Sequence, residues 1–574
     1  DVQLLSNGRY HVMVTSAGGG YSRYREIALT RWQEDSTRDN WGSFCYIRDL
    51  SSGEYWSGAF QPSLKPSRHY EAIFSEGRAE FRRSDHGLDL HWDMVISPED
   101  DIELRRLKIT NRSAVARSLE ITSYAEVVLA PAIADALHLA FSKLFVQTEI
   151  LDPLETILCH RRPRSSTEQA LWLFHLMTVH NGVSEAISYE TDRAQFIGRT
   201  QQLDAPHALQ TAGKLSNSSG AVLDPIVAIR HVLTLQPEAT VTLDMVLGVS
   251  ESREACVDLA EKYRDQHIAD RVFDLAWTHS QVFLRQLNAL DSEAQLYAQL
   301  ANAILYSNAT LRADPSVIAS NRRAQSGLWA HAISGDLPIV LLQIKNMESL
   351  ELVRQLVKAH AYWRLKGLSV DLIIWNEDRD IYRQSLQEQI LGLIAWSVEA
   401  HVIDRPGGIF VRQAEHLSRE DRMLIQTVAR LIISDSQGSL EDQLSRQFTP
   451  ELRRPAFRPK RKSTIPGPVL PSQLAPRPDL ILFNGLGGFT ADGRVYVMNL
   501  APEQSPPAPW SNILANPYFG SVVTEAGQAY TWVENAHEHR LTPWYNDPIS
   551  DPSGEAFYLR DEDSGHYWSP MPLP

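Results

Sequence analysis

The chain has 574 residues and a formal net charge of −15, with 43% hydrophobic and 22% charged residues. A single hydrophobic core does not extend over this length, so several domains are expected, each with enough apolar residues for its own core. The negative charge argues against general binding to nucleic acid or to anionic membranes. Cys45, Cys159 and Cys256 are too few and too scattered for a disulfide framework or a zinc cluster, which favours a reducing compartment.

No apolar run reaches the roughly 18–20 residues that span a bilayer, and the first residues, DVQLLSNGRYHV, lack the pattern of a signal peptide. The chain also begins without methionine, which indicates a piece of a longer protein. We therefore expect this portion to be cytoplasmic, with no membrane partner of its own.

Residues 1–250 alternate between apolar and polar positions in short stretches such as DLHWDMVISP and IELRRLKITN, separated by Gly, Ser, Asn and Asp clusters. This period of two predicts a large antiparallel β-sandwich. From Ser252 the period becomes helical, and residues 251–330 are predicted to form a helical connector that Ser252 caps.

Residues 331–440 alternate between apolar strands and amphipathic helices, from LPIVLLQI to LIISD, with one helix ending at Gly367 and another capped by Ser418. This alternation predicts a small α/β domain with parallel strands. Neither a Walker A loop nor GxGxxG accompanies its first turn, so nothing in the sequence supports a nucleotide site there. Residues 441–478 are rich in proline and basic residues, as expected of a solvated linker.

Two distant segments of the chain repeat each other. NGRYHVMVTSAGGGYS (7–22) aligns without a gap with NPYFGSVVTEAGQAYT (516–531), and after a three-residue insertion RDLSSGEYWS (48–57) aligns with RDEDSGHYWS (560–569). Residues 479–574 are therefore predicted to be the first strands of a second β-sandwich, whose partners must come from elsewhere. The predicted fold class is α+β multidomain: a large antiparallel sandwich, a helical connector, a small α/β domain and the start of a second sandwich.

Several long stretches carry a family resemblance: YAEVVLAPAIADALHLAFSKLFVQTE (124–149), ETDRAQFIGR (190–199), SGLWAHAISGDLPIVL (326–341), AHAYWRLKGLSVDLIIWNE (359–377), NGLGGFTADGRVYV (484–497) and LTPWYNDPISDPSGEAFYLRDEDSG (541–565). With them the chain resembles the C-terminal half of bacterial cyclic β-1,2-glucan synthases and the β-1,2-oligoglucan phosphorylases of the cellobiose-phosphorylase family. The first stretch departs from the family where Leu139 stands in place of a proline.

The resemblance implies a glucan-processing parent enzyme in which a second sandwich is followed by an (α/α)6 barrel. In the phosphorylases of this family, an Asp of a DWNDG-type motif in that barrel protonates the leaving oxygen while inorganic phosphate attacks C1, an inverting geometry. This chain has no DWNDG, and its nearest string, IIWNED (373–378), ends a predicted strand. No catalytic residue is therefore assigned, and no cofactor is expected apart from inorganic phosphate if the parent is a phosphorylase.

The candidate site is the stretch ENAHEHRLTPWYNDP (534–548). Aromatic faces can stack on glucose, and carboxylate, amide and guanidinium groups can bond its hydroxyls. The predicted glucan contacts are Glu538, Arg540, Trp544, Asn546 and Asp547. Trp544 and Asp547 have counterparts in Trp32 and Asp35, which also fits a structural corner and a turn cap.

Other polar groups gave weaker candidates. His537, Glu538 and His539 are adjacent, which is not the spacing of a zinc site, and no metal is predicted. Asp336 in Ser334-Gly335-Asp336 fits a turn or a cap better than a catalytic acid. Glu377 and Asp378 follow a strand, where open α/β sheets bind ligands.

Three hypotheses remain open. The first is an accessory, carbohydrate-binding or structural portion of a β-1,2-glucan-processing enzyme, with glucan or gluco-oligosaccharide as ligand and with a missing barrel domain or a second subunit as partner. The second is a fragment of an active inverting phosphorylase or transglycosylase. The third is a scaffold without affinity for glycans. The resemblance also allows a homodimer and a parent associated with the inner membrane.

Overall fold

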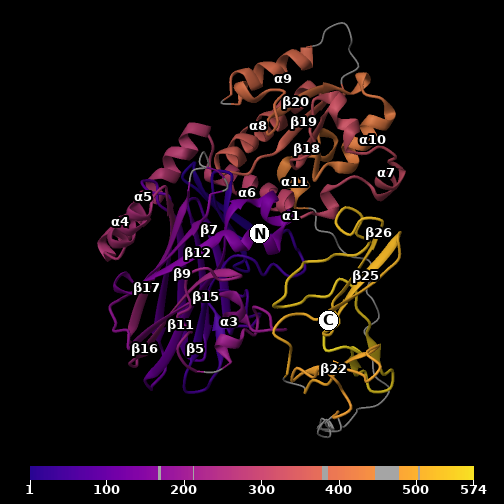
Figure 1. Cartoon of the computed structure of the whole chain (residues 1–574). Helices are drawn as coiled ribbons and strands as arrows, with labels where there is room; N and C mark the ends of the chain where they lie inside the picture. Colours follow the sequence, from indigo (N-terminus) through magenta and orange to yellow (C-terminus); the bar gives the residue numbers. More distant parts are fainter. Residues whose placement is uncertain are drawn as a thin grey trace. The chain divides into compact units, whose positions relative to one another are not determined.

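The computed structural model describes residues 1–163, 165, 170–210, 212–377, 385–397, 399–445, 477–501 and 504–573. Most of the predicted basic linker and Asp378 lie outside these residues. The chain forms two units, one of residues 1–192 and 212–449 and one of residues 193–211 and 450–574. Figure 1 colours the sandwich of the first unit indigo to magenta, its α/β domain orange and the C-terminal module yellow.

The first unit begins with the predicted antiparallel sandwich. One sheet has the order β1-β2-β3-β4-β11-β16-β15, with β5 on β11 and β6 on β5. Its strands are β1 (Val2–Ser6), β2 (Tyr10–Thr15), β3 (Gly20–Tyr24), β4 (Ile27–Thr30), β5 (Ser43–Asp49), β6 (Tyr55–Ser57), β11 (Arg117–Pro131), β15 (Ala186–Asp192) and β16 (Pro225–Leu235).

The second sheet has the order β12-β13-β14-β17-β10-β9-β8-β7. Its strands are β7 (His69–Ser75), β8 (Arg78–Asp85), β9 (Leu88–Ile96), β10 (Ile102–Asn111), β12 (Val146–Leu151), β13 (Thr156–Arg161), β14 (Trp172–His180) and β17 (Thr240–Ser250).

Alternation along β9 shows why these residues form strands. Leu90, Trp92 and Met94 face the core between the sheets, whereas Val95 faces the other side, where helices cover it. The covering helices are α4 (Arg253–Tyr263) and α5 (Gln266–Leu287), which Figure 1 shows beside the sandwich. The Ser252 hydroxyl accepts the Ala255 N–H at 3.1 Å, so the predicted cap of α4 is confirmed.

The α/β domain follows α6 (Asp291–Leu305) and the short α7 (Pro315–Ser320). Its sheet is fully parallel, with the order β20-β19-β18-β21. Both faces are covered: Val340 and Leu342 pack toward α6 and α8, and Leu341 packs on the opposite side with Leu424. The elements are β18 (Ile339–Ile344), α8 (Leu350–Leu365), β19 (Asp371–Asn376), α9 (Ser385–Ala395), β20 (Ile409–Gln413), α10 (Arg419–Val428), β21 (Leu431–Ser434) and α11 (Leu440–Leu444).

Two predicted helix boundaries of this domain are confirmed. The Ser418 hydroxyl accepts the Asp421 N–H at 3.1 Å at the start of α10. Gly367, at φ +84°, ends α8 in the left-handed region. Among the described residues, no helix combines the length and the apolar composition needed to cross a bilayer.

The second unit contains the predicted repeat. Its elements are α3 (Arg193–Ile197), β22 (Gly487–Phe489), β23 (Tyr496–Met498), β24 (Ser511–Ala515), β25 (Phe519–Thr524), β26 (Ala529–Val533), β27 (Leu559–Arg560) and β28 (Tyr567–Trp568). Strands β24, β25 and β26 correspond to β1, β2 and β3, and the register repeats: Val2 pairs with Thr15, and Ser511 with Thr524.

The repeat extends to individual hydrogen bonds. The Thr15 hydroxyl donates to Asp39 at 2.6 Å, and the Thr524 hydroxyl donates to Asp551 at 3.1 Å. Asp39 and Asp551 both have φ +48°, and each donates its N–H at 3.0 Å to the carbonyl oxygen four residues earlier. Such agreement in geometry confirms that the two segments are copies of one module.

The copies differ in burial. Leu5, Tyr10, Cys45, Ile47 and Trp56 are each at most 2% exposed in the core of the first copy. Their counterparts in the second copy are Leu514 (58% exposed), Phe519 (48%), Phe557 (70%), Leu559 (49%) and Trp568 (51%). In the part of the chain that the structure describes, the second copy therefore has the core-facing residues of a sandwich without a sheet that covers them.

A matched pair of substitutions tests this difference. Leu5→Ala should lower the free energy of unfolding of the first unit by about 2–5 kcal/mol because it removes buried methyl groups and leaves a cavity. Leu514→Ala should change stability by less than about 0.5 kcal/mol because its side chain is exposed. Urea unfolding of both variants measures this, and equal losses would contradict the assignment.

An ion triad with one exposed member, Asp270, joins the sandwich to α5. Arg106 of β10 donates to both oxygens of Asp244 of β17 at 2.7 and 2.8 Å, and it also pairs with Asp270 of α5. Burial alone would raise the pKa of Asp244, but hydrogen bonds from Arg106 and His180 outweigh it and hold that pKa below its usual value.

The triad predicts that the free energy of unfolding falls at acidic pH. Because the pKa of Asp244 is lower in the folded protein than in the unfolded chain, its contribution is present above about pH 4 and is lost as pH falls below it. Asp244→Asn should therefore lower stability at pH 7 and flatten the fall in stability between about pH 4 and pH 2. Thermal unfolding across this range measures the effect, and a steep fall retained in the variant would contradict it.

Candidate functional site

The candidate loop of residues 534–548 follows β26. The Asn535 side chain accepts the N–H groups of His537 and Glu538 at 2.8 and 2.9 Å and forms the turn. His537 pairs with Glu538 at 2.6 Å. Glu538, Arg540 and Asn546 are exposed, and Asn546 has φ +49°. These three side chains are accessible to a ligand, and their contact with glucan stays a prediction.

Trp544 is half-buried and stacks on Tyr530, with ring centroids 4.5 Å apart and planes 6° from parallel. In the first copy the same pair, Trp32 and Tyr21, meets edge to face at 5.5 Å and 67°. Stacking takes up one face of the Trp544 ring. Packing of this tryptophan on a tyrosine at the corner of the sandwich is therefore common to both copies. A sugar would have to contact the other face of the Trp544 ring.

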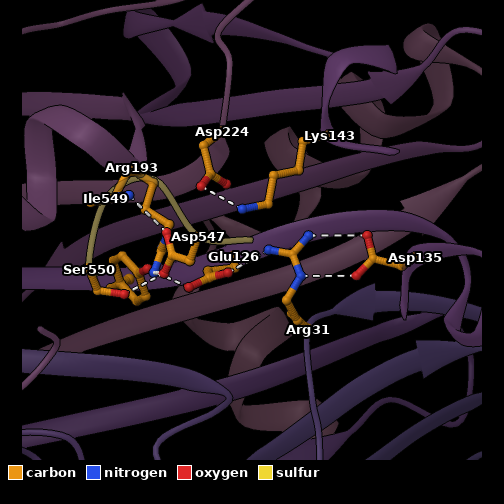
Figure 2. A network of polar contacts seen from close by, with 10 residues as sticks. Arg31, Glu126, Asp135, Lys143, Arg193, Asp224, Asp547, Ile549 and Ser550 are labelled. Carbon is orange, nitrogen blue, oxygen red and sulfur yellow. Dashed lines mark hydrogen bonds and ion pairs between the residues drawn. The ribbon is translucent and has the colours of Figure 1, made fainter. Parts of the chain in front are cut away.

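Asp547 is held by a partner that the sequence did not indicate. Arg193 of α3 donates to both of its oxygens at 2.8 and 2.9 Å, and both side chains are largely buried (Figure 2). Asp547 also accepts the Ile549 N–H at 3.0 Å and the Ser550 hydroxyl. These contacts make Asp547 a turn cap and an ion-pair partner, and its predicted glucan contact stays a prediction.

Arg199 adds a second link between residues 193–211 and the C-terminal module. It donates to Glu525 at 2.7 Å and to Asp551 at 2.9 Å. Burial raises the pKa of Asp551 although Arg199 and Thr524 lower it. The family-like stretch ETDRAQFIGR contained both arginines, but nothing in the spacing of the sequence pointed to acids more than 300 positions away.

Substituting Arg193 tests this attachment. Arg193→Met should destabilise the second unit by about 3–5 kcal/mol because it leaves the largely buried Asp547 carboxylate without its ion pair. Hydrogen–deuterium exchange should become faster in residues 519–551 and stay unchanged in the equivalent residues 10–39. Asp35→Asn, at the matching turn of the first copy, is the control, and unchanged exchange in residues 519–551 would contradict the attachment.

A second group of buried charges lies in the first unit, at the junction of β4, β11 and α1 (Ala132–Leu137). Arg31 pairs with Glu126 and, at 2.9 Å, with Asp135, while Lys143 pairs with Asp224 at 2.6 Å (Figure 2). Burial opposes the charge of Arg31, but the two carboxylates outweigh it and raise its pKa. Because their carboxylates are held in ion pairs, these buried residues are better described as a structural anchor than as a general acid–base pair.

The anchored segment carries exposed apolar side chains. It contains α1, α2 (Leu139–Ser142) and a 3-10 turn (Lys143–Phe145). Ile133, Leu137, Phe141 and Leu144 are 67%, 50%, 62% and 48% exposed. Several exposed apolar side chains on one short segment are typical of an interaction surface.

The weaker candidates also have assigned contacts. Asp336 donates its N–H to the Ser334 hydroxyl at 3.2 Å in a turn with Gly335 at φ +78°, and Glu377 pairs with Lys345 at 3.1 Å. Strand β18 lies between β19 and β21, so the chain reverses its strand order beside it.

At that reversal point the Asp435 carboxylate accepts the N–H groups of Lys345 and Asn346 at 2.7 and 3.1 Å. The amides that would hold a ligand phosphate there are occupied by the protein's own carboxylate. This geometry disfavours nucleotide binding at this edge of the sheet.

One cluster in the first unit has the composition of a metal site. Among the described residues, Glu80, His91 and Asp93 could share an ion. However, Arg78 pairs with both carboxylates, and Arg82 donates to Glu80 at 2.5 Å. Two guanidinium groups already neutralise these acids, so the cluster is better described as a network of ion pairs on the outer face of the sheet.

The two large antiparallel sheets of the first unit form the kind of sandwich that is called a supersandwich. The supersandwich domain of the glycosyl hydrolase 94 family matches residues 1–266 and 494–574, which together are more than half of the chain. The chain therefore belongs to this family. The first matched segment contains the first module, and the second contains the whole of the aligned repeat.

Individual relatives agree with this assignment. The chain is 32% identical, over 574 residues and 99% of its length, to the cyclic beta-(1,2)-glucan synthase NdvB of Rhizobium meliloti (strain 1021). It is 25% identical over 275 residues, 47% of its length, to N,N'-diacetylchitobiose phosphorylase of Vibrio furnissii. A solabiose phosphorylase of Paenibacillus borealis is 23% identical over 38% of the chain. The chain spans 20%, 33% and 27% of these three relatives' own lengths.

Proposed function

We propose that this chain is an accessory portion of a β-1,2-glucan-processing enzyme, which binds glucan and supports assembly without performing catalysis alone. The observation that carries the proposal is the similarity over nearly the whole chain to a cyclic beta-(1,2)-glucan synthase. The alignment covers 99% of the chain, so the similarity is not confined to the sandwich.

The contacts of the acidic groups agree with an accessory role. Asp547 and Asp551 are held by Arg193 and Arg199, and Asp336 lies in a turn. A general acid needs a carboxyl group that can reach the substrate and hold a proton near neutral pH. The exposed groups of the candidate loop, Glu538 and Arg540, are suited to bonding hydroxyls of a sugar.

The exposed apolar face of the second copy supports the proposal that a partner covers it. In the first copy, the equivalents of Leu514, Phe519 and Phe557 are covered by the second sheet of the sandwich. We propose that this face packs against the remaining sheet of a second supersandwich, supplied by further polypeptide of the intact enzyme. A second subunit could supply the same sheet.

A second candidate function is a fragment of an active inverting phosphorylase, which the similarity to N,N'-diacetylchitobiose phosphorylase favours. In that case inorganic phosphate would be a substrate, and a carboxyl group would protonate the leaving oxygen. The two candidates differ in one measurable product, because only the phosphorylase would release glucose 1-phosphate from glucan and phosphate.

Calorimetric titration of the whole chain with linear β-1,2-glucan tests the proposal. We expect saturable binding, no release of glucose 1-phosphate in the presence of phosphate, and about tenfold weaker binding by the double variant Glu538→Gln/Arg540→Ala because it loses charge-assisted hydrogen bonds to the sugar. His416→Ala, an exposed histidine of the α/β domain, is the control.

Each alternative has a distinct result. Robust release of glucose 1-phosphate would replace the accessory role by the phosphorylase role. If no binding is seen up to millimolar glucan, the remaining hypothesis is a scaffold without affinity for glycans.

A further inference from the structure

A groove of about 580 Å³ opens in the first unit, and none of the site residues that the sequence predicted lines it. It lies where the outer strand of each sheet meets the helices: β1 and β7 form one wall, and α5, α6 and α8 form the other. Its volume falls within the range of about 300–1,000 Å³ of small-molecule sites. Both walls belong to regular strands and helices, which hold side chains in place better than loops do.

Aromatic rings and several amides line the groove. Trp277 of α5 is 65% exposed, and Phe74 of β7 is half-buried. A large exposed tryptophan on a rigid helix presents a flat apolar surface to solvent at little cost in conformational entropy. Gln281, Gln295 and Gln299 add their amides to the same groove, whereas Gln3 is buried and donates to the Ser75 carbonyl oxygen at 2.6 Å.

The floor of the groove is held by internal contacts. The Glu76 carboxylate accepts the Tyr362 hydroxyl at 3.2 Å and pairs with Lys366 at 2.6 Å. Gly77, at φ +78°, brings this turn against α5, where a Cβ would lie 3.1 Å from the Ala276 carbonyl oxygen. The turn between β7 and β8 therefore needs glycine, and it fixes Glu76 in position.

The charges of the groove exclude one class of ligand. Asp1, Glu76 and Asp291 line it, and no lysine or arginine is among the described residues that do so. Three carboxyl groups disfavour phosphates, nucleotides and other anions, which are bound by lysine, arginine or clustered amide N–H groups. The groove therefore favours an uncharged ligand with one apolar face and several hydroxyl groups.

We propose that this groove is a second binding site for a neutral oligosaccharide, distinct from the loop of residues 534–548 and built around Trp277. A pyranose ring has an apolar face, which stacks on the Trp277 indole, and a rim of hydroxyls, which pair with the glutamine amides because each amide both donates and accepts. In the glucan-processing role proposed above, on which this specificity rests, the ligand is a β-1,2-gluco-oligosaccharide.

Calorimetry on the whole chain with sophoro-oligosaccharides tests the groove. Trp277→Ala should weaken binding to it by about tenfold, Trp277→Phe by less because it retains a stacking surface, and Gln299→Leu by a few-fold. Trp329→Ala is the matched control because Trp329 is 64% exposed and lies outside the groove lining. Thermal unfolding of each variant checks that the fold is intact.

Fluorine NMR of protein labelled with 5-fluorotryptophan locates the contact among the 14 tryptophans. The resonance that disappears in Trp277→Phe should shift on titration, and it should do so equally in Glu538→Gln/Arg540→Ala. A Trp277 resonance that does not move, or full affinity in Trp277→Ala, would overturn the groove as a binding site.

Titration with two further ligands distinguishes failure of the groove proposal from failure of the proposed function. If cello- or malto-oligosaccharides bind through Trp277 and β-1,2-glucan binds nowhere on the chain, the groove stands as an oligosaccharide site and the β-1,2-glucan role fails. If β-1,2-glucan binds and only the Glu538/Arg540 variant weakens it, the proposed function stands and the groove fails. Without binding of any of these oligosaccharides, both fail.

Discussion

Burial of one apolar sheet face against another is the constraint on which this structure depends. In the first module, residues such as Tyr10, Ile47 and Trp56 are enclosed because β7–β10 and β17 provide the opposite sheet. The second copy repeats strands β1–β3 in the same register, with the same threonine–aspartate hydrogen bond, yet Phe519, Leu559 and Trp568 are exposed. Local structure is therefore encoded in about 60 residues of each copy, whereas a core needs the complementary sheet.

Buried ion pairs attach the irregular segments to this frame. Arg31 and Lys143 hold the segment after β11, and Arg193 and Arg199 hold the C-terminal module to residues 193–211. Breaking such a pair costs more than forming it contributes, because it leaves a charge in a poorly solvated place. The pairs therefore determine where these segments lie more than they add to overall stability.

The sandwich and the segments attached to it contribute different evidence about function. The sandwich scaffold places the chain in the glycosyl hydrolase 94 family, and the exposed polar groups lie on elements that this scaffold holds. We propose the loop of residues 534–548 and the Trp277 groove as two binding sites for uncharged, hydroxyl-rich ligands. Two such sites fit the accessory role in glucan processing that we propose for this chain.

Local patterns in the sequence predicted much of the fold. Alternation along β9, the strand–helix alternation after Pro338, the caps at Ser252 and Ser418 and the left-handed Gly367 all depend on neighbouring residues, and the structure confirms them. The repeat could also be found in the sequence, because an alignment needs no knowledge of contacts. The exposure of the second copy's apolar residues could not be predicted, since it depends on strands that are distant in the sequence.

The sequence by itself determined the elements, their order, the duplication and the family, because each is a property of adjacent residues or of direct comparison. Only the tertiary structure decided which groups of the candidate site remain accessible. Asp547 and Arg193 are separated by 354 positions, and Trp277 meets Gln3 and Phe74 only after two sheet edges and three helices come together. Ion pairs and grooves of this kind form between distant segments, and no local pattern in the sequence records which segments will meet.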